Sequence, residues 1–169
     1  IAPGSSDSTD VVRSFQYQVG GLSNVLMTPE SLQAGATGNL RVSFQLLNPL
    51  PADGVIVIEL ARTFAFVSTP TVDITPDSWM DGILSVNLES ETRVVLQRAL
   101  GSAVPAGGLV DIVLTDVRNQ GFAGISPRTS VTTFSSSGIL IDTGKSETVT
   151  LMVASLAAVS VSFETAVAG

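Results

Sequence analysis

The sequence contains no cysteine and no histidine. Without a thiol or an imidazole, the chain lacks the nucleophiles and bases of Cys-His and Ser-His-Asp sites, and it lacks the ligands of the usual zinc sites. The missing cysteine also means that no disulfide supports the fold, although it does not fix the redox compartment. Aromatic residues make up only 5% of the chain, so aliphatic side chains have to fill the core.

Charged residues are scarce as well, and the formal net charge is −7. Grouped Lys and Arg are needed to neutralise phosphates, so an acidic chain without a basic cluster predicts no nucleic-acid partner. No apolar run approaches the ~20 residues of a membrane span, and we expect no membrane insertion. Serine and threonine are abundant while Lys145 is the single lysine, which is typical of proteins placed outside the cell or on its surface.

What the sequence does have is alternation with a period of two. Apolar residues alternate with polar ones from Leu40 to Leu46, which predicts a half-buried strand. A turn-forming Asn-Pro-Leu-Pro-Ala-Asp-Gly stretch then leads to the apolar run Val55–Leu60. We predict that these two strands supply the core with Leu40, Val42, Phe44, Leu46, Ile56 and Ile58.

Further runs rich in Val, Ile and Thr are separated by Gly, Pro, Asp and Asn, and no window predicts a convincing amphipathic helix. The other expected strands are 11–19, 83–88, 92–98, 109–115, 128–134, 138–141 and 147–163. This spacing predicts an all-β chain that folds as a single antiparallel β-sandwich with strand-like terminal extensions. The connections of an immunoglobulin-like fold and of a jelly roll both remain open.

The end of the chain resembles a stretch near its beginning. Leu156–Gly169 aligns with Leu22–Gly35 without a gap, with identical residues at five of the aligned positions. We therefore divide the chain into an extended leader and candidate exchanged strand (1–21), a sandwich module (22–155) and a C-terminal strand (156–169) that resembles the start of a following module.

Several short phrases occur in a characteristic order between Leu22 and Asp142. They are Ala34-Gly-Ala-Thr-Gly38, Val42-Ser-Phe44, Asn48-Pro-Leu-Pro-Ala-Asp-Gly54, Val104-Pro-Ala-Gly107, Val117-Arg-Asn119, Ala123-Gly124, Val131-Thr-Thr133 and Ile141-Asp142. Together they resemble tandem β-sandwich repeat modules of large secreted and cell-surface proteins of bacteria, algae and related microbes. The resemblance implies an extracellular, structural or adhesive module that is used in series, and it brings no catalytic residues.

Acidic residues suggest two kinds of site, and for both the plainer interpretation is favoured. Asp73, Asp77 and Asp81 stand four residues apart and could hold calcium. They lack the spacing of an EF-hand loop and its final bidentate glutamate, so solvated loop acids are favoured and no metal is expected. Glu89 and Glu91 flank a hairpin tip, whereas a glycosidase needs two carboxylates that face a cleft. We predict no enzymatic activity and no cofactor.

Two kinds of residue could contact sugars. Trp79, the single tryptophan, or Tyr17 could stack on a sugar ring, although a buried or interface anchor is favoured for the tryptophan. Thr69, Thr71 and Thr75 lie beside prolines and are candidates for O-linked glycans, against an ordinary role in turns.

These observations predict a structural protomer of an extracellular filament or surface layer. Copies of the chain would assemble head to tail by exchanging a terminal strand, with the N-terminal one slightly favoured as the donor. The expected interface residues are Val11, Phe15, Tyr17, Val19, Val159, Val161, Phe163 and Val167. The alternative is a carbohydrate-binding or adhesive module from a tandem-repeat surface protein, with glycans as partners.

Overall fold

The computed structural model describes residues 18–154. The strands are β1 (Gly20–Gly21), β2 (Ser23–Pro29), β3 (Thr37–Gln45), β4 (Val55–Glu59), β5 (Ala65–Phe66), β6 (Val72–Ile74), β7 (Ile83–Ser90), β8 (Arg93–Ala99), β9 (Leu109–Arg118), β10 (Gly124–Ile125), β11 (Ser130–Phe134), β12 (Leu140–Lys145) and β13 (Thr150–Leu151). The expectations for residues 1–17 and 155–169 lie outside the described residues.

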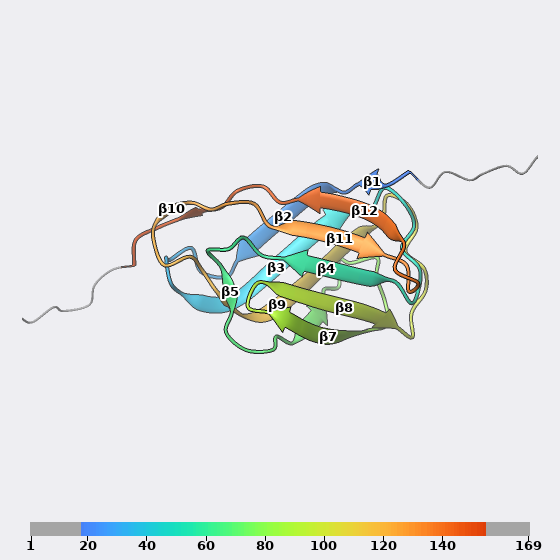
Figure 1. Cartoon of the computed structure of the whole chain (residues 1–169), viewed down its shortest axis with the longest axis horizontal. Helices are drawn as coiled ribbons and strands as arrows, with labels where there is room; N and C mark the ends of the chain where they lie inside the picture. The colour runs from blue at the N-terminus through green and yellow to red at the C-terminus, as the bar shows by residue number, and fades with distance from the viewer. Residues whose placement is uncertain (1–17, 155–169) are drawn as a thin grey trace, which may run out of the picture.

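Two main sheets face each other and form a sandwich (Figure 1). One has the strand order β1-β12-β11-β4-β8-β7, and the other has the order β2-β3-β9-β5, with β6 also paired to β9. A short β10–β13 pair lies at one end of the long axis and β1 at the other. The all-β sandwich is therefore confirmed. The pairs are antiparallel except that of β1 with β12, which is parallel.

The core contains every residue that the sequence predicted for it. Leu40, Phe44, Ile56 and Ile58 have no exposed surface, and Val42 and Leu46 are at most 2% exposed. Because side chains alternate across a strand, this register turns Arg41 outward. Each fully buried aliphatic or aromatic side chain stabilises the fold by about 1.5–3 kcal/mol before the cost of ordering the chain.

The strand bounds differ from expectation near the C-terminus. The strand expected at 138–141 begins later and runs to Lys145, because the polar Asp142 points inward and breaks the apolar alternation. Within the described part of 147–163, only Thr150–Leu151 pairs as a strand. No helix with the length and apolar character of a membrane span occurs between residues 18 and 154.

Candidate functional site

Exposed apolar side chains lie at both ends of the long axis. At the β10–β13 end the exposed residues are Leu32, Phe122, Ile125, Met152 and Val153. Backbone bonds hold their segments together, because Met152 N donates to Leu32 O at 2.8 Å. At the opposite end the exposed residues include Val19, Leu47, Trp79, Ile83, Leu100 and Ile139. Where such side chains form a contiguous patch, a folded chain can contact other molecules there.

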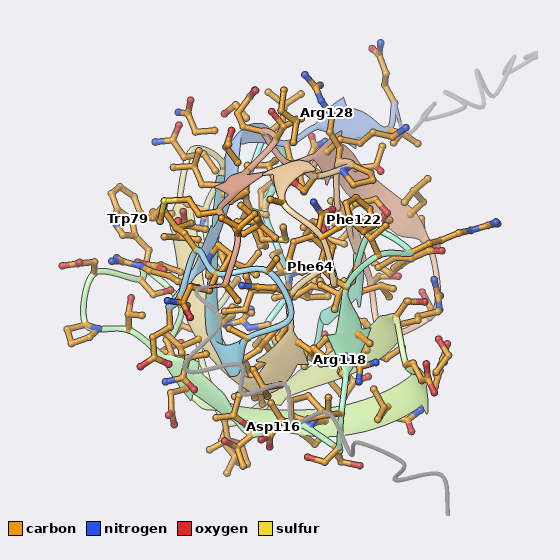
Figure 2. All side chains as sticks on the ribbon, turned by 90° about the vertical axis from the view of Figure 1, so that its left-hand side faces the viewer. Phe64, Trp79, Asp116, Arg118, Phe122 and Arg128 are labelled. Carbon is orange, nitrogen blue, oxygen red and sulfur yellow. The ribbon has the colours of Figure 1, made fainter. Side chains whose placement is uncertain are left out.

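Trp79 is 62% exposed, so the expectation of a buried anchor is wrong, while the expectation of an interface anchor stays a prediction. In Figure 2, Phe64 lies inside the sandwich while Trp79 projects from its outline. The tryptophan is therefore available either as an interface anchor or as a stacking surface. The other exposed aromatic side chain of the described residues, Phe122, lies at the β10 end of the sandwich, so the two rings do not form one platform.

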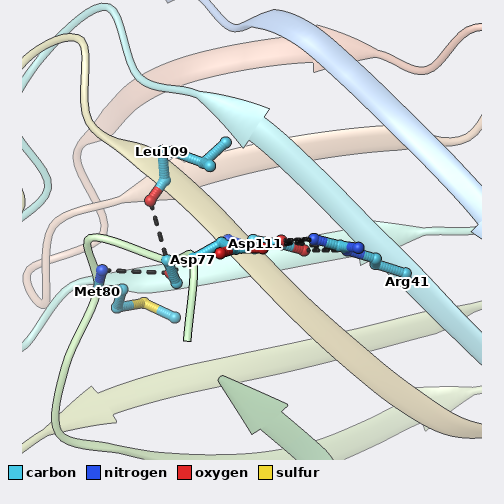
Figure 3. Close-up of polar contacts among 6 residues, drawn as sticks. Arg41, Asp77, Met80, Leu109 and Asp111 are labelled. Atoms are coloured by element: carbon cyan, nitrogen blue, oxygen red, sulfur yellow. Dashed lines mark hydrogen bonds and ion pairs between the residues drawn. The ribbon is translucent and has the colours of Figure 1, made fainter. Parts of the chain in front are cut away.

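A polar cluster fixes the loop that carries Trp79 (Figure 3). Arg41 Nε donates to the two carboxylate oxygens of Asp111 at 2.9 and 3.1 Å, and its Nη2 also lies 3.4 Å from Asp77 Oδ2. The Asp111 side chain is 1% exposed, whereas that of Arg41 is half exposed. Ser78 Oγ accepts from Met80 N and from Asp111 N, each at 3.2 Å. These contacts attach the loop to β9 and hold the Arg41 guanidinium against Asp77, which lies two residues before the tryptophan.

Hydrogen bonds from Arg41 lower the pKa of Asp111, and burial of the carboxyl opposes this effect. The folded state then holds the Asp111 proton less tightly than the unfolded state does. The resulting stabilisation is complete above the unfolded pKa of about 3.9 and is lost as the pH falls through the lower folded pKa.

We expect Asp111→Asn to be less stable than the parent at pH 7, and we expect the difference to shrink below about pH 4. Urea denaturation between neutral and acid pH measures both unfolding free energies. If the unfolding free energies of the parent and of Asp111→Asn fall in parallel as the pH is lowered, the Asp111 carboxylate does not contribute to the loss of stability in acid.

The three aspartates proposed for calcium are not brought together. Asp73 lies in β6, Asp77 contacts Arg41, and Asp81 Oδ1 accepts from Ser102 N at 2.7 Å. The hydrogen bond from Ser102 lowers the pKa of Asp81. Among residues 18–154, no three acidic side chains converge in a way that could hold a metal ion.

The candidate glycan acceptors differ in accessibility. Thr69 is exposed, and Thr71 is exposed with its Oγ1 3.3 Å from Thr115 Oγ1. The hydroxyl of Thr75 is buried, so it offers no acceptor for a glycan. Of the expected interface residues, only Val19 is described; it is 45% exposed, and the other seven lie outside the described residues.

The acids of the β7–β8 hairpin do not share a cavity. Glu89 lies 2.6 Å from Arg93 Nε on the same hairpin. The larger of two open hollows, about 540 Å³, contains no acidic residue and is lined by Gln18, Asn48, Pro49, Pro51, Ser135, Ser137, Ile139, Leu140 and Ile141. A smaller hollow of about 320 Å³ includes Glu91 and Arg118.

Several buried polar residues were not predicted by the sequence pattern, and three of them bind the backbone of neighbouring segments. Asp142 accepts hydrogen bonds from Leu47 N and Asn48 N, both at 3.0 Å. Asn119 Nδ2 donates to Ser31 O and Gln33 O at 2.7 and 2.9 Å. The third residue, Arg98, donates to the carbonyls of two loops. Asn48, Asn119 and Asp142 all belong to the phrases that carry the family resemblance, so those phrases mark contacts that hold the fold.

Comparison with known proteins identifies a fold and no sequence family. No family model matches the chain, and no curated protein is similar enough in sequence to count as a relative. The chain is similar in structure to BslA, described as a bacterial hydrophobin, with a TM-score of 0.52 and 14% identity over 82% of this chain and 99% of that one.

Two further similarities are weaker. The carbohydrate-binding module CBM3b of Clostridium thermocellum cellobiohydrolase 9A has a TM-score of 0.43 and 13% identity, covering 71% of this chain and 95% of that one. A non-cellulosomal cohesin of the archaeon Archaeoglobus fulgidus has a TM-score of 0.35 and 9% identity, covering 79% of this chain and 93% of that one. At these identities the likeness concerns the β-sandwich fold alone.

Proposed function

We propose that this chain is a non-catalytic extracellular module that works in series, with one end of each copy contacting the next copy. The observation that carries the proposal is the position of β1 and the β10–β13 pair at opposite ends of the long axis, each near exposed apolar side chains. A contact between two different ends is heterologous, and it extends into a filament or an array when its rotation does not close a ring.

The apparent duplication supports the same function. The first copy of the duplicated stretch contains β2, which forms an edge of its own sheet and pairs only with β3. That place in the module is therefore filled by residues of the described chain. The second copy, Leu156–Gly169, is then suited to begin the next module of a longer chain or to contact another subunit. The serine-rich and lysine-poor composition supports a place outside the cell.

The test is self-association of the full chain, measured by light scattering and electron microscopy. We expect concentration-dependent oligomers that weaken at least about tenfold in Phe122→Ser/Ile125→Ser, because the double variant removes apolar area from one end. Leu26→Ser is the matched control, since Leu26 is 47% exposed on β2 between the ends. A chain that stays monomeric at high concentration, or equal losses in both variants, would contradict end-to-end assembly.

A second candidate function, glycan binding, is favoured by the exposed Trp79, whose loop also carries Asp77 in contact with Arg41. Aromatic rings stack on the apolar faces of sugars, and charged groups nearby can bind hydroxyls. Because Trp79 is the single tryptophan, its fluorescence reports this surface directly during titration with soluble oligosaccharides. Binding should disappear in Trp79→Ala and persist in Phe122→Ala. An unchanged emission spectrum with cellulose, chitin and mannan oligomers would remove this candidate.

A further inference from the structure

The free edge of β7 is the longest unpaired strand edge of the six-stranded sheet. The strand spans Ile83–Ser90, stands last in the sheet order, and pairs only with β8. The other end of the same sheet is β1, which has two residues. An exposed edge of eight residues presents a row of backbone N–H and C=O groups that can pair with another strand.

The side of the sandwich below this edge is only partly closed. Leu84, Val86 and Leu88 point toward the core, but they remain partly exposed. From the other sheet, Val72 and Ile74 of β6 are also partly buried, and β6 is only three residues long. An added strand with apolar residues on its inner face would therefore cover side chains that the module itself leaves half exposed.

One segment of the same chain has the pattern that such a strand needs. Residues 84–90 read Leu-Ser-Val-Asn-Leu-Glu-Ser, and residues 159–165 read Val-Ser-Val-Ser-Phe-Glu-Thr. Each position carries the same kind of side chain, with apolar residues alternating with serine, asparagine or glutamate. The C-terminal segment thus has the sequence of a β7-like strand, with Val159, Val161 and Phe163 on one face.

We propose that residues 159–165 of one copy add as an antiparallel strand to the free edge of β7 in a second copy. The proposal rests on the serial assembly of the proposed function, but it places the acceptor at the β7 edge of the next copy instead of at the β1 end. The alternation of residues 159–165, matched to β7, selects this segment over the N-terminal one as the donor. Main-chain hydrogen bonds would provide binding, and Val159, Val161 and Phe163 would cover the partly exposed residues of β7 and β6.

Charge decides the orientation. A parallel strand aligned residue for residue with β7 would set Glu164 beside Glu89, and like charges at such positions repel. In the antiparallel arrangement with Val161 opposite Val86, Glu164 lies opposite Ile83, and Ser160 lies opposite Asn87. The two glutamates are then at opposite ends of the strand pair.

Chain length favours a second copy over the chain's own β7. The described chain ends beside the β2–β3 connection, where Met152 bonds to Leu32 and Ala34. In Figure 1, the β10–β13 pair and β7 lie on different sides of the molecule. Only five residues lead from Ala154 to Val159, and they span at most about 18 Å when fully extended.

The native chain has no cysteine, so crosslinking of single-cysteine variants tests the arrangement cleanly. Asn87→Cys and Ser160→Cys full-length chains, mixed and oxidised, should form a heterodimer. Asn87→Cys mixed with Thr165→Cys is the control, and it should crosslink at least tenfold less because those positions are far apart in this register. Absence of the heterodimer, or equal crosslinking in both mixtures, would overturn the proposed pairing.

Two further measurements separate the possible failures. The double variant Asn87→Cys/Ser160→Cys would form an intrachain disulfide if the segment returned to its own β7, and that result in monomers would overturn the proposal. Val161→Lys should weaken assembly at least tenfold, while Ser162→Lys, on the outer face, should not. If the parent chain assembles and both lysine variants assemble equally well, the proposed donor segment is wrong and serial assembly stands. If neither the parent nor any variant associates, serial assembly itself is wrong.

Discussion

Replacing Arg98 by alanine should lower the unfolding free energy by about 3 kcal/mol, and the melting temperature by about 10 °C. Arg98 is 2% exposed, although it carries a guanidinium. It donates to Leu50 O at 3.2 Å, to Pro51 O at 2.5 Å and to Ser102 O at 2.8 Å. It therefore ties together two loops that flank the end of β8. Burial lowers the pKa of Arg98 and the charge of Asp81 opposes this, but an arginine remains protonated at neutral pH.

Hydrogen bonds from a charged donor are each worth about 1.5–3 kcal/mol, and relief of the desolvated charge offsets part of their loss. Arg98→Met retains most of the volume but loses the hydrogen bonds to the three carbonyls, so it should still be less stable than the parent. Arg93→Ala on the same strand is the control, because Arg93 forms partly exposed ion pairs that are worth at most about 1 kcal/mol. Calorimetry and urea denaturation measure these changes. If Arg93→Ala costs as much as Arg98→Ala, the buried contacts of Arg98 have no special role.

The sandwich was predictable because its central strands have a strong apolar–polar alternation. The strand at 40–46 places polar Arg41 and Ser43 between apolar residues, so only one register buries the apolar face. The apolar run of β4 could be assigned because turn residues bound it. In contrast, β12 was misplaced because Asp142 occupies an inward position, where a sequence pattern expects an apolar side chain.

The surface was much less predictable from the sequence. Nothing local indicates that Trp79 stays exposed, because its placement depends on Ser78, which bonds to β9 more than thirty positions away. The partners of Arg41 likewise come from the Asp77 loop and from β9. A period-two pattern reports which face of a strand is buried, but it carries no information on which distant polar groups meet. The similarity of 159–165 to β7 becomes informative only once β7 is known to be a free edge.

Gly20→Ala should be about as damaging as the loss of Arg98, at about 3 kcal/mol, the upper end of the usual cost of overpacking. A methyl group on Gly20 would overlap Asp142 Oδ1 and lie 2.5 Å from Asn48 Nδ2. Neither group can move freely, because Asn48 Nδ2 donates to Asp142 Oδ1 at 2.7 Å while Asp142 Oδ2 accepts from Leu47 N and Asn48 N. The methyl group must therefore displace β1 from β12 or break this buried cluster.

The neighbouring glycine provides the control for this prediction. A methyl group on Gly21 meets no atom within 4 Å, so Gly21→Ala should be neutral or slightly stabilising, because alanine restricts the unfolded chain. Denaturation curves of Gly20→Ala and Gly21→Ala test this contrast. Similar unfolding free energies for the two variants would show that β1 can move away from β12 without loss of stability. Asp142→Ala separates the two ways in which Gly20→Ala can act. If Gly20→Ala damages the fold by disrupting the Asp142 cluster, the double variant Gly20→Ala/Asp142→Ala should lose less unfolding free energy than the two single variants lose together. The methyl group would then occupy the space that the carboxylate has left.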